Sequence, residues 1–178
     1  MKKINYVIIF SIVLAFGFFY TNQENNNSKK PIQKPLTAEE MKTARKKWEA
    51  SPDGIMYMEW KASPAGKKVI ASATKIRTSV NEFSNIEAEI IALTLPPGSR
   101  LGFGIMVKIK GDDYILTFGP ELNNEFKQLH SLKVTDKIII KSHSISHAPK
   151  YSYPIISGDY VERDNKILYK RVRKKGGC

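Results

Sequence analysis

The sequence predicts an α+β, mainly β fold: an N-terminal hydrophobic helix, a short helical segment and then a domain of five strands. Three observations predict it. The chain opens on an apolar run without charge, residues 37–83 carry apolar side chains at helical spacing, and from residue 85 the apolar residues form short β-rich runs. Cys178 is the only cysteine, so the fold must be stabilised by its core and not by internal disulfide bonds.

Residues 1–23 have the layout of an export segment. Lys2 and Lys3 precede a stretch from Ile4 to Gln23 that contains no charged residue. A basic start followed by an apolar run is typical of a signal peptide or signal anchor. The continuous apolar run of about 15 residues is shorter than the roughly 20 of a spanning helix and near the upper limit of a cleavable signal. We expect an inner-membrane anchor with the domain outside the cytoplasm, and the alternative is a cleaved signal that leaves a secreted or periplasmic protein.

A linker and a helical segment follow. Residues 24–36 are polar and interrupted by Pro31 and Pro35, which predicts a flexible linker. The helical segment spans residues 37–83. It begins with Thr37-Ala-Glu-Glu40, a capping box in which side-chain oxygens accept hydrogen bonds from amides left free at a helix start, and this predicts a helix to about Ala50.

A short repeat occurs twice in this helical segment and predicts where its helices end and begin. Trp48-Glu-Ala-Ser-Pro-Asp-Gly54 is followed 12 residues later by Trp60-Lys-Ala-Ser-Pro-Ala-Gly66. Serine before proline suits an N-cap followed by a first helical residue that needs no amide hydrogen, so each copy predicts the end of one helix and the start of another. After the second copy, four apolar residues share helical spacing and predict one buried face: Val69, Ala73, Ile76 and Val80.

Residues 84–171 read as the β domain. The first strand covers Ile86 to Leu95 and ends at Pro96-Pro97-Gly98. Two further strands, Gly102 to Ile109 and Tyr114 to Phe118, form a hairpin around a polar turn. The remaining elements are expected in this order: a helix over Glu121 to Leu132, a fourth strand over Val134 to Lys141, a long loop from Ser142 to Tyr153, and a fifth strand over Ile155 to Val161 with an extension at Lys166 to Arg171.

This order of elements resembles the OB-fold, a five-stranded Greek-key barrel with a helix between its third and fourth strands. Two stretches of the sequence are similar to those of such barrels. One leads into the fourth strand, Leu132-Lys-Val-Thr-Asp-Lys-Ile-Ile139, and the other lies in the last strand, Gly158-Asp-Tyr-Val-Glu-Arg163. The chain also looks similar to small exported OB-like proteins of bacterial envelopes. The resemblance implies a closed barrel, and an SH3-like barrel is the alternative.

The resemblance also implies where a ligand would bind. OB-like barrels use the outer face of the second and third strands together with the loops between strands one and two and between strands four and five. Aromatic rings beside cations on such a face suit a nucleic acid or a sugar chain. The candidate ligand-binding residues at these places are Arg100, Phe103, Lys108, Tyr114, His147, Lys150 and Tyr151.

Charge narrows the class of partner. The formal net charge is +12, with clusters at Arg45-Lys46-Lys47, Lys67-Lys68 and Lys170 to Lys175; residues 172–178 are expected to form a basic tail. A basic protein attracts nucleic acid, anionic lipid or acidic wall polymers. We expect a non-enzymatic, membrane-tethered binding module for an envelope protein or an anionic polymer. The alternatives are a nucleic-acid-binding OB module for single strands and an exported hydrolase or redox enzyme with a site assembled in space.

No cofactor or metal site is predicted. His143 and His147 are four residues apart, but on a strand or loop they lie too far apart to share a metal, and no cysteine or carboxylate cluster is nearby. Gly102-Phe-Gly104 lacks the third glycine of a dinucleotide-binding motif. A pocket that gathers His143 or His147 with a carboxylate would indicate an enzyme.

Overall fold

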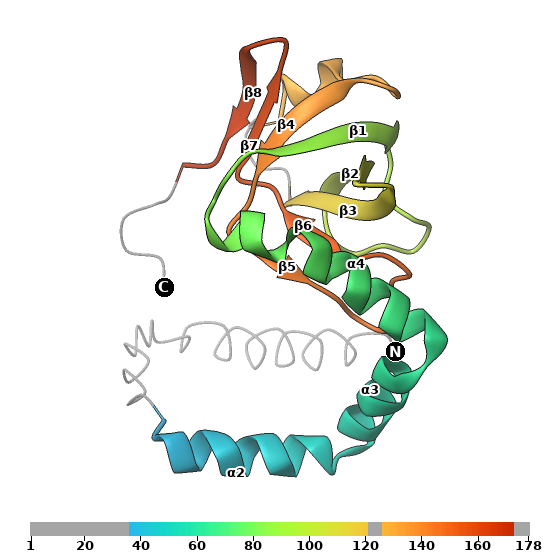
Figure 1. Ribbon diagram of the computed structural model, residues 1–178, viewed down its shortest axis with the longest axis vertical. Helices are drawn as coiled ribbons and strands as arrows, with labels where there is room; N and C mark the ends of the chain where they lie inside the picture. Colours follow the sequence, from blue (N-terminus) through green and yellow to red (C-terminus); the bar gives the residue numbers. More distant parts are fainter. Residues whose placement is uncertain (1–35, 121–125, 173–178) are drawn as a thin grey trace, which may run out of the picture. The chain divides into compact units, whose positions relative to one another are not determined.

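The computed structural model describes residues 36–120 and 126–172, and it has an α+β fold dominated by one sheet (Figure 1). The predicted export segment, most of the linker and most of the basic tail lie outside the described residues. Among the helices that are described, none combines the length and the apolar character needed to cross a membrane. The chain divides into two compact units, Met1–Met41 and Lys42–Cys178.

The predicted helix starts are confirmed. Helix α2 spans Ala38–Glu49, α3 spans Pro52–Ala62 and α4 spans Pro64–Asn81. At the start of α2 the capping box is formed, since the Thr37 amide donates to Glu40 Oε2 at 2.7 Å and the Glu40 amide to Thr37 Oγ1 at 3.2 Å. Ser51 and Ser63 are the N-caps of α3 and α4, with Pro52 and Pro64 directly after them.

The two copies of the sequence repeat form the same corner between helices. Each cap serine accepts from the amide of the repeat's glycine, at 3.2 Å for Gly54 and 3.1 Å for Gly66. Each serine hydroxyl also donates to the carbonyl of the preceding tryptophan, Trp48 or Trp60, at 2.6 Å. One side chain therefore satisfies the end of one helix and the beginning of the next, which explains the recurring serine. The recurring glycine is explained by the carbonyl oxygen of the tryptophan, which a Cβ would meet at 2.0 Å in both copies.

Eight strands form one mixed sheet in the order β5-β6-β3-β2-β1-β4-β7-β8. All neighbours are antiparallel except β3 and β6, which are parallel. The strands are β1 (Ile86–Ala92), β2 (Phe103–Ile109), β3 (Asp112–Gly119), β4 (Lys137–Lys141), β5 (Ile145–Ser146), β6 (Ile155–Ser157), β7 (Tyr160–Arg163) and β8 (Lys166–Lys170).

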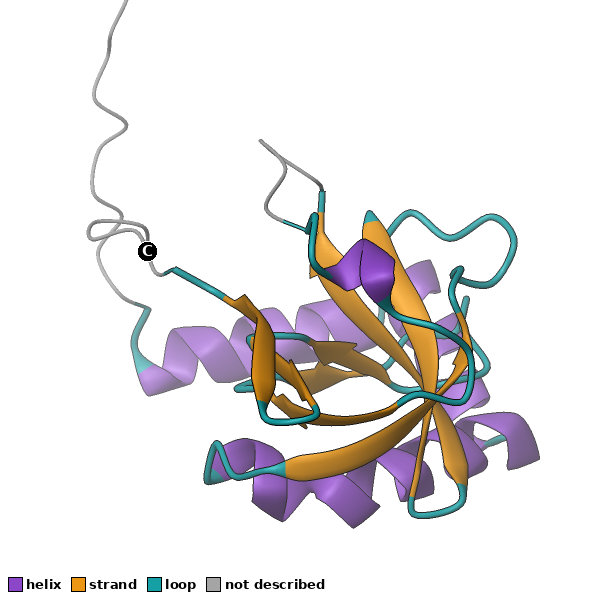
Figure 2. Ribbon diagram, turned by 90° about the horizontal axis from the view of Figure 1, so that it is seen from above, coloured by secondary structure: helices purple, strands orange, loops and turns teal. Residues whose placement is uncertain are grey.

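The expectation of a closed five-stranded barrel is wrong, because this sheet is open and has β5 and β8 at its edges. The strands are nevertheless strongly curved (Figure 2). The expected fifth strand is split into β6, which pairs with β3, and β7, which pairs with β4. Between them the Gly158 amide donates to Thr117 of β3 at 2.8 Å and the Asp159 amide to Lys141 of β4 at 3.0 Å. The chain thus crosses here from one half of the sheet to the other without forming a continuous ladder.

The helix expected over residues 121–132 is not found in the described part of this segment, which forms turns instead. Residues 121–125 lie outside the described ranges, and the rest contains one 3-10 turn, η1 (Leu129–Ser131). Phe126, Leu129 and Leu132 are buried in the main core, so this segment covers the sheet with its apolar residues. The predicted apolar face of α4 is confirmed, since Val69, Ala73, Ile76 and Val80 are all buried.

Tyr114 connects α4 to the sheet. Its side chain is fully buried and its hydroxyl donates to the Ser72 carbonyl of α4 at 2.7 Å. Burial, with a smaller contribution from the charge of Asp112, raises the pKa of Tyr114 to about 12. Because this pKa lies above the value near 10 of an unfolded tyrosine, the protonated phenol stabilises the fold fully below about pH 10, and that stabilisation is lost as the pH rises towards 12.

We expect Tyr114→Phe to lower the free energy of unfolding at pH 7 by about 1–2 kcal/mol, because the Ser72 carbonyl loses its buried donor. Between pH 10 and 12 the variant should lose less stability than the parent, so the two curves converge. Urea unfolding at pH 7, 10 and 11.5 measures both effects, with the partly exposed Tyr153→Phe as the control. Parallel curves for the parent and Tyr114→Phe over the alkaline range would contradict the assignment.

Candidate functional site

Three neighbouring strands bring polar and aromatic side chains into one row. In the strand register Lys141 of β4 is opposite Tyr160 of β7, and Tyr160 is opposite Lys170 of β8. Residues directly opposite one another in adjacent strands project from the same face of a sheet. The sheet topology therefore places a lysine on each side of a tyrosine, although the three residues come from separate parts of the sequence.

A hollow of about 320 Å³ lies over this row. Its lining includes the row itself together with Phe83, which follows α4, and Asp159 and Arg171, which flank β7 and β8. The Lys141 ammonium lies 5.5 Å from the centre of the Tyr160 ring and 5.9 Å from that of Phe83, so two aromatic faces hold it in place. The hollow therefore offers both rings and cations to a ligand.

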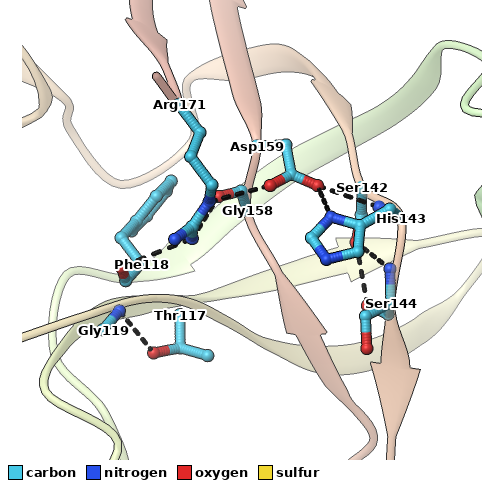
Figure 3. Close-up of polar contacts among 9 residues, drawn as sticks. All are labelled: Thr117, Phe118, Gly119, Ser142, His143, Ser144, Gly158, Asp159 and Arg171. Atoms are coloured by element: carbon cyan, nitrogen blue, oxygen red, sulfur yellow. Dashed lines mark hydrogen bonds and ion pairs between the residues drawn. The ribbon is translucent and has the colours of Figure 1, made fainter. Parts of the chain in front are cut away.

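The Asp159 carboxylate at the edge of the hollow is buried and partnered on both sides (Figure 3). Its Oδ1 lies 2.8 Å from Arg171 Nε, a distance suited to an ion pair although the two atoms are not aligned for a hydrogen bond. Its Oδ2 accepts from the His143 amide at 2.9 Å and also contacts His143 Nδ1. Arg171 donates further to the Gly158 carbonyl at 2.9 Å. The negative charge of Asp159 is thus compensated inside the protein.

The lining has a surplus of positive charge. Lys141, Lys170 and Arg171 line the hollow with the carboxylate of Asp159, and beside the row the Glu162 carboxylate accepts a hydrogen bond from the Tyr160 hydroxyl. Within the ranges that the structure describes, neither Lys141 nor Lys170 belongs to an ion pair, whereas Lys75 and Lys108 each pair with an aspartate. Cations held beside rings without a carboxylate partner are suited to an acidic group such as a phosphate, sulfate or carboxylate.

His143 lies beside this hollow on a turn whose geometry is fixed. The buried Ser142 hydroxyl donates to the Ser144 carbonyl at 2.8 Å and accepts from the Ser144 amide at 3.0 Å. Asp159 holds His143 Nδ1, and half of the imidazole side chain is exposed. This arrangement matches one feature of an acid–base pair, a histidine oriented by a buried carboxylate.

The structure brings three of the seven predicted site residues together. The Arg100 amide donates to the Tyr151 hydroxyl at 3.3 Å, and Lys150 Nζ donates to the Gly98 carbonyl at 2.7 Å. Lys150 Nζ also lies 5.5 Å from the centre of the Tyr151 ring. The neighbouring Ser99 side chain is the largest of the causes that lower the pKa of Tyr151, and the Arg100 amide is the next. The two loops in which these residues lie therefore contact each other.

The other four residues lie elsewhere. Phe103 packs on Phe126 with ring centres 5.1 Å apart, and Lys108 pairs with Asp113 at 2.5 Å. Tyr114 is in the core, where no ligand at the surface can reach it. His147 is part of a ring cluster with α3. Because a single binding face needs these side chains to converge, the seven residues do not form one site.

The cluster around His147 has its own geometry. His147 Nε2 hydrogen-bonds the Tyr57 hydroxyl at 3.0 Å, and the imidazole stacks on the rings of Tyr57 and Trp60 at 6.3 and 5.8 Å between centres. Burial is the main cause that lowers the pKa of His147, followed by the charges of Arg77 and Lys61. The imidazole packs against both rings, which also contact each other at 5.7 Å, and this cluster fixes α3 to the loop that contains β5.

The row formed by Lys141, Tyr160 and Lys170 was missed by sequence reasoning. Two stretches noted in the sequence contain Tyr160 and Lys170, namely Gly158 to Arg163 and the basic run from Lys170. What the sequence does not contain is the pairing of β4 with β7 and of β7 with β8, which decides that these residues meet.

No family model, curated protein or solved structure matches this chain in the comparisons with known proteins. The function must therefore be argued from the geometry. The hollow over Lys141, Tyr160 and Lys170 combines a defined volume, aromatic walls and two lysines that have no carboxylate partner among the described residues.

Proposed function

We propose that this protein is a non-enzymatic binding module that holds an acidic group of an anionic polymer in the hollow over Lys141, Tyr160 and Lys170. The observation that supports it most is the row of cations and rings on three adjacent strands, in which the two lysines have no carboxylate partner in the described part of the chain. The net charge of +12 adds a long-range attraction for any polyanion.

We place the module in the cell envelope, tethered to the inner membrane through residues 4–23. The basic start and the apolar run without charge support this location. Outside the cytoplasm, acidic wall polymers and anionic lipids are more abundant partners than nucleic acid. The tether keeps the hollow within reach of such polymers, and no cofactor takes part in binding.

We also propose that the sheet is a variant of the OB-like arrangement. In support, β1 pairs with both β2 and β4, β3 pairs in parallel with β6, and η1 lies between β3 and β4 in sequence. The chain crossing at Gly158 and Asp159 links the two halves of the sheet where a barrel would close. The hollow lies at this crossing and not on the face of β2 and β3 that OB-like barrels usually use.

The first test is binding of the full chain in detergent to inorganic polyphosphate, to poly-glutamate and to a dT oligonucleotide at several salt concentrations. We expect the double variant Lys141→Gln, Lys170→Gln to bind polyphosphate at least about tenfold more weakly, with a salt slope lower by about two, because two phosphate contacts are removed. Fluorescence anisotropy of a labelled polymer measures both quantities.

The matched control is the double variant Lys137→Gln, Lys166→Gln, which changes two exposed lysines of the same strands β4 and β8. It removes the same charge outside the hollow, so we expect a loss of less than about threefold. Equal losses in the two double variants would show that only net charge attracts the polymer, and the proposed site would be wrong. Tightest binding to dT, lost in Tyr160→Ala, would instead favour the nucleic-acid module.

One observation favours an exported hydrolase as the second candidate. The structure gathers His143 with the carboxylate of Asp159, the arrangement that indicates acid–base chemistry. Hydrolysis of a polymer by the parent that disappears in His143→Gln, with binding retained, would establish this function in place of the first. Unchanged polymer length after prolonged incubation with the parent would exclude it for that polymer.

A further inference from the structure

Phe83 occupies a backbone position at the end of α4 that normally belongs to glycine. Its amide donates to the Val80 carbonyl at 3.1 Å. The Ser84 amide donates to the Ser79 carbonyl at 2.9 Å, and the two bonds together form the Schellman arrangement that closes a helix. This arrangement needs a left-handed residue directly after the helix cap, and the φ of Phe83 is +52°. Because a residue with a Cβ is disfavoured in this conformation, phenylalanine strains the turn.

Packing in the core does not explain the choice of phenylalanine. Neither of the two apolar clusters that the described residues form includes Phe83, which is 42% exposed. Its ring instead lines the hollow, where the Lys141 ammonium lies 5.9 Å from the ring centre. Strained residues concentrate at ligand sites, where the side chain has a use that offsets the strain. The backbone of Phe83 therefore points to the hollow as the place where its ring acts.

The hollow sets aromatic faces directly beside a cation. Lys141 Nζ also lies 5.5 Å from the centre of the Tyr160 ring, so ring and ammonium are close together on both sides. A ligand that uses both features must carry an apolar face and an acidic group equally close together. A sugar with a carboxylate on its ring has this arrangement, because its C–H groups suit an aromatic face and its acid suits a lysine. A nucleotide separates phosphate from base by the ribose, and polyphosphate has no ring.

We infer that the acidic group held in the hollow belongs to a sugar, so that the polymer is an acidic polysaccharide. The Phe83 ring packs against the C–H face of one sugar, and Lys141 and Lys170 bind its carboxylate. The volume of about 320 Å³ is at the small end of the range for ligand sites, which suits a single unit of the chain. This inference rests on the proposed function, since it names the polymer that the same hollow binds.

The test compares three labelled polymers of equal charge, with the full chain in detergent and fluorescence anisotropy as the readout. Oligogalacturonate carries a carboxylate on every sugar, poly-glutamate carries carboxylates on a peptide, and polyphosphate has neither sugar nor carboxylate. We expect Phe83→Gly to bind oligogalacturonate at least about fivefold more weakly, because a packed aromatic ring is lost. Binding of the other two polymers should stay within about twofold of the parent, since the lysines that attract them remain.

Further variants separate the ring from the backbone. Phe83→Leu keeps an apolar side chain without the ring and should lose affinity for oligogalacturonate as Phe83→Gly does, whereas Phe83→Tyr should keep it. The matched control is Asn165→Gly, which places glycine at another left-handed residue, with φ +60°, outside the lining of the hollow. It leaves the charge unchanged, so all three polymers should bind it within about twofold of the parent. Circular dichroism checks that each variant is folded.

Three results would overturn the inference. Equal losses for all three polymers in Phe83→Gly would show that the ring only positions Lys141. Unchanged oligogalacturonate binding in Phe83→Gly or Phe83→Leu would show that the ring does not touch the sugar. A larger loss for a dT oligonucleotide than for oligogalacturonate would show that the ring stacks on a base.

The lysine double variant distinguishes failure of this inference from failure of the proposed function. Lys141→Gln with Lys170→Gln should weaken the binding of all three polymers, because it removes the cations that any acidic group would use. If it does so while Phe83→Gly has no effect, the proposed site is correct and the acidic sugar is wrong. If the lysine variant binds every polymer as the parent does, the proposed site itself is wrong.

Discussion

Replacement of Gly66 by alanine is expected to lower the free energy of unfolding by about 3 kcal/mol, because the added methyl group has no space. A Cβ at position 66 would lie 2.0 Å from the carbonyl oxygen of Trp60 and 2.8 Å from its carbon. Both are backbone atoms, so no side chain can rotate to relieve the overlap. The corner between α3 and α4 must open, and this displaces the buried face of α4. Urea unfolding followed by circular dichroism measures the loss.

The sequence repeat supplies a matched comparison. Gly54→Ala introduces the same overlap, 2.0 Å from the Trp48 carbonyl oxygen, at the corner between α2 and α3. Because α2 contributes no buried residue, this corner can open at a cost of less than about 1 kcal/mol to global stability. Ala65→Ser, one residue before Gly66 and exposed, should change stability by less than about 0.5 kcal/mol. Equal losses for the two glycine variants would contradict the different roles assigned to α2 and α4.

Local elements of this fold could be predicted because local chemistry determines them. The capping box at Thr37 and the two Ser-Pro caps fixed three helix starts, and the periodicity of α4 identified its buried face. The hairpin of β2 and β3 followed from a polar turn between β-rich runs. In each case the residues that decide the structure are neighbours in the sequence.

Pairing between distant strands could not be predicted in the same way. The segment from Ile155 to Val161 reads as one strand, yet it divides between β3 and β4 because Gly158 lies against the Phe118 ring, where a Cβ would meet it at 2.5 Å. The short strand β5 could not be predicted and was expected to be part of a loop, because two residues are too few to show the alternation of apolar and polar side chains typical of a strand. These pairings between distant strands decide whether the sheet closes into a barrel, and here the sheet is open.

Tyr114 of β3 is the predicted site residue that lies furthest from the expected position, because it is fully buried. Alternation predicts that every second residue of a strand faces outward, but all residues from Tyr114 to Phe118 are buried. Tyr114 lies in the core that includes α4, while Ile115 belongs to a second apolar cluster with Met106 and Ile155 that Tyr151 and Tyr153 cover. Both faces of β3 are thus covered, and Tyr114 is unavailable to a ligand. The cation row on β4, β7 and β8 depends on register, which the sequence alone does not reveal.

Substitution of Asp159 is expected to have the second large effect on stability. Its expected effect on polymer binding has the opposite sign. Breaking a buried ion pair typically costs about 3–5 kcal/mol, but Arg171 and His143 are partly exposed and water compensates part of their loss. We therefore expect Asp159→Ala to lower the free energy of unfolding by about 2–3 kcal/mol. Asp164→Asn, whose side chain is 89% exposed beside Arg163, should change it by less than about 0.5 kcal/mol.

Removal of the same carboxylate charge by asparagine, which also loses the ion pair with Arg171, has the opposite consequence for binding. Among the described residues that line the hollow, Asp159 alone carries a carboxylate, so Asp159→Asn, which keeps the shape of the side chain, makes the hollow more positive. We expect this variant to bind polyphosphate as tightly as the parent or up to about tenfold more tightly, although it is less stable. The lysine double variant should behave in the reverse way, with normal stability and weak binding. If Asp159→Asn remains folded by circular dichroism at the assay temperature and still loses polyphosphate binding, the carboxylate contacts the ligand or positions the site, and the assignment of the lysines as the main contacts is wrong.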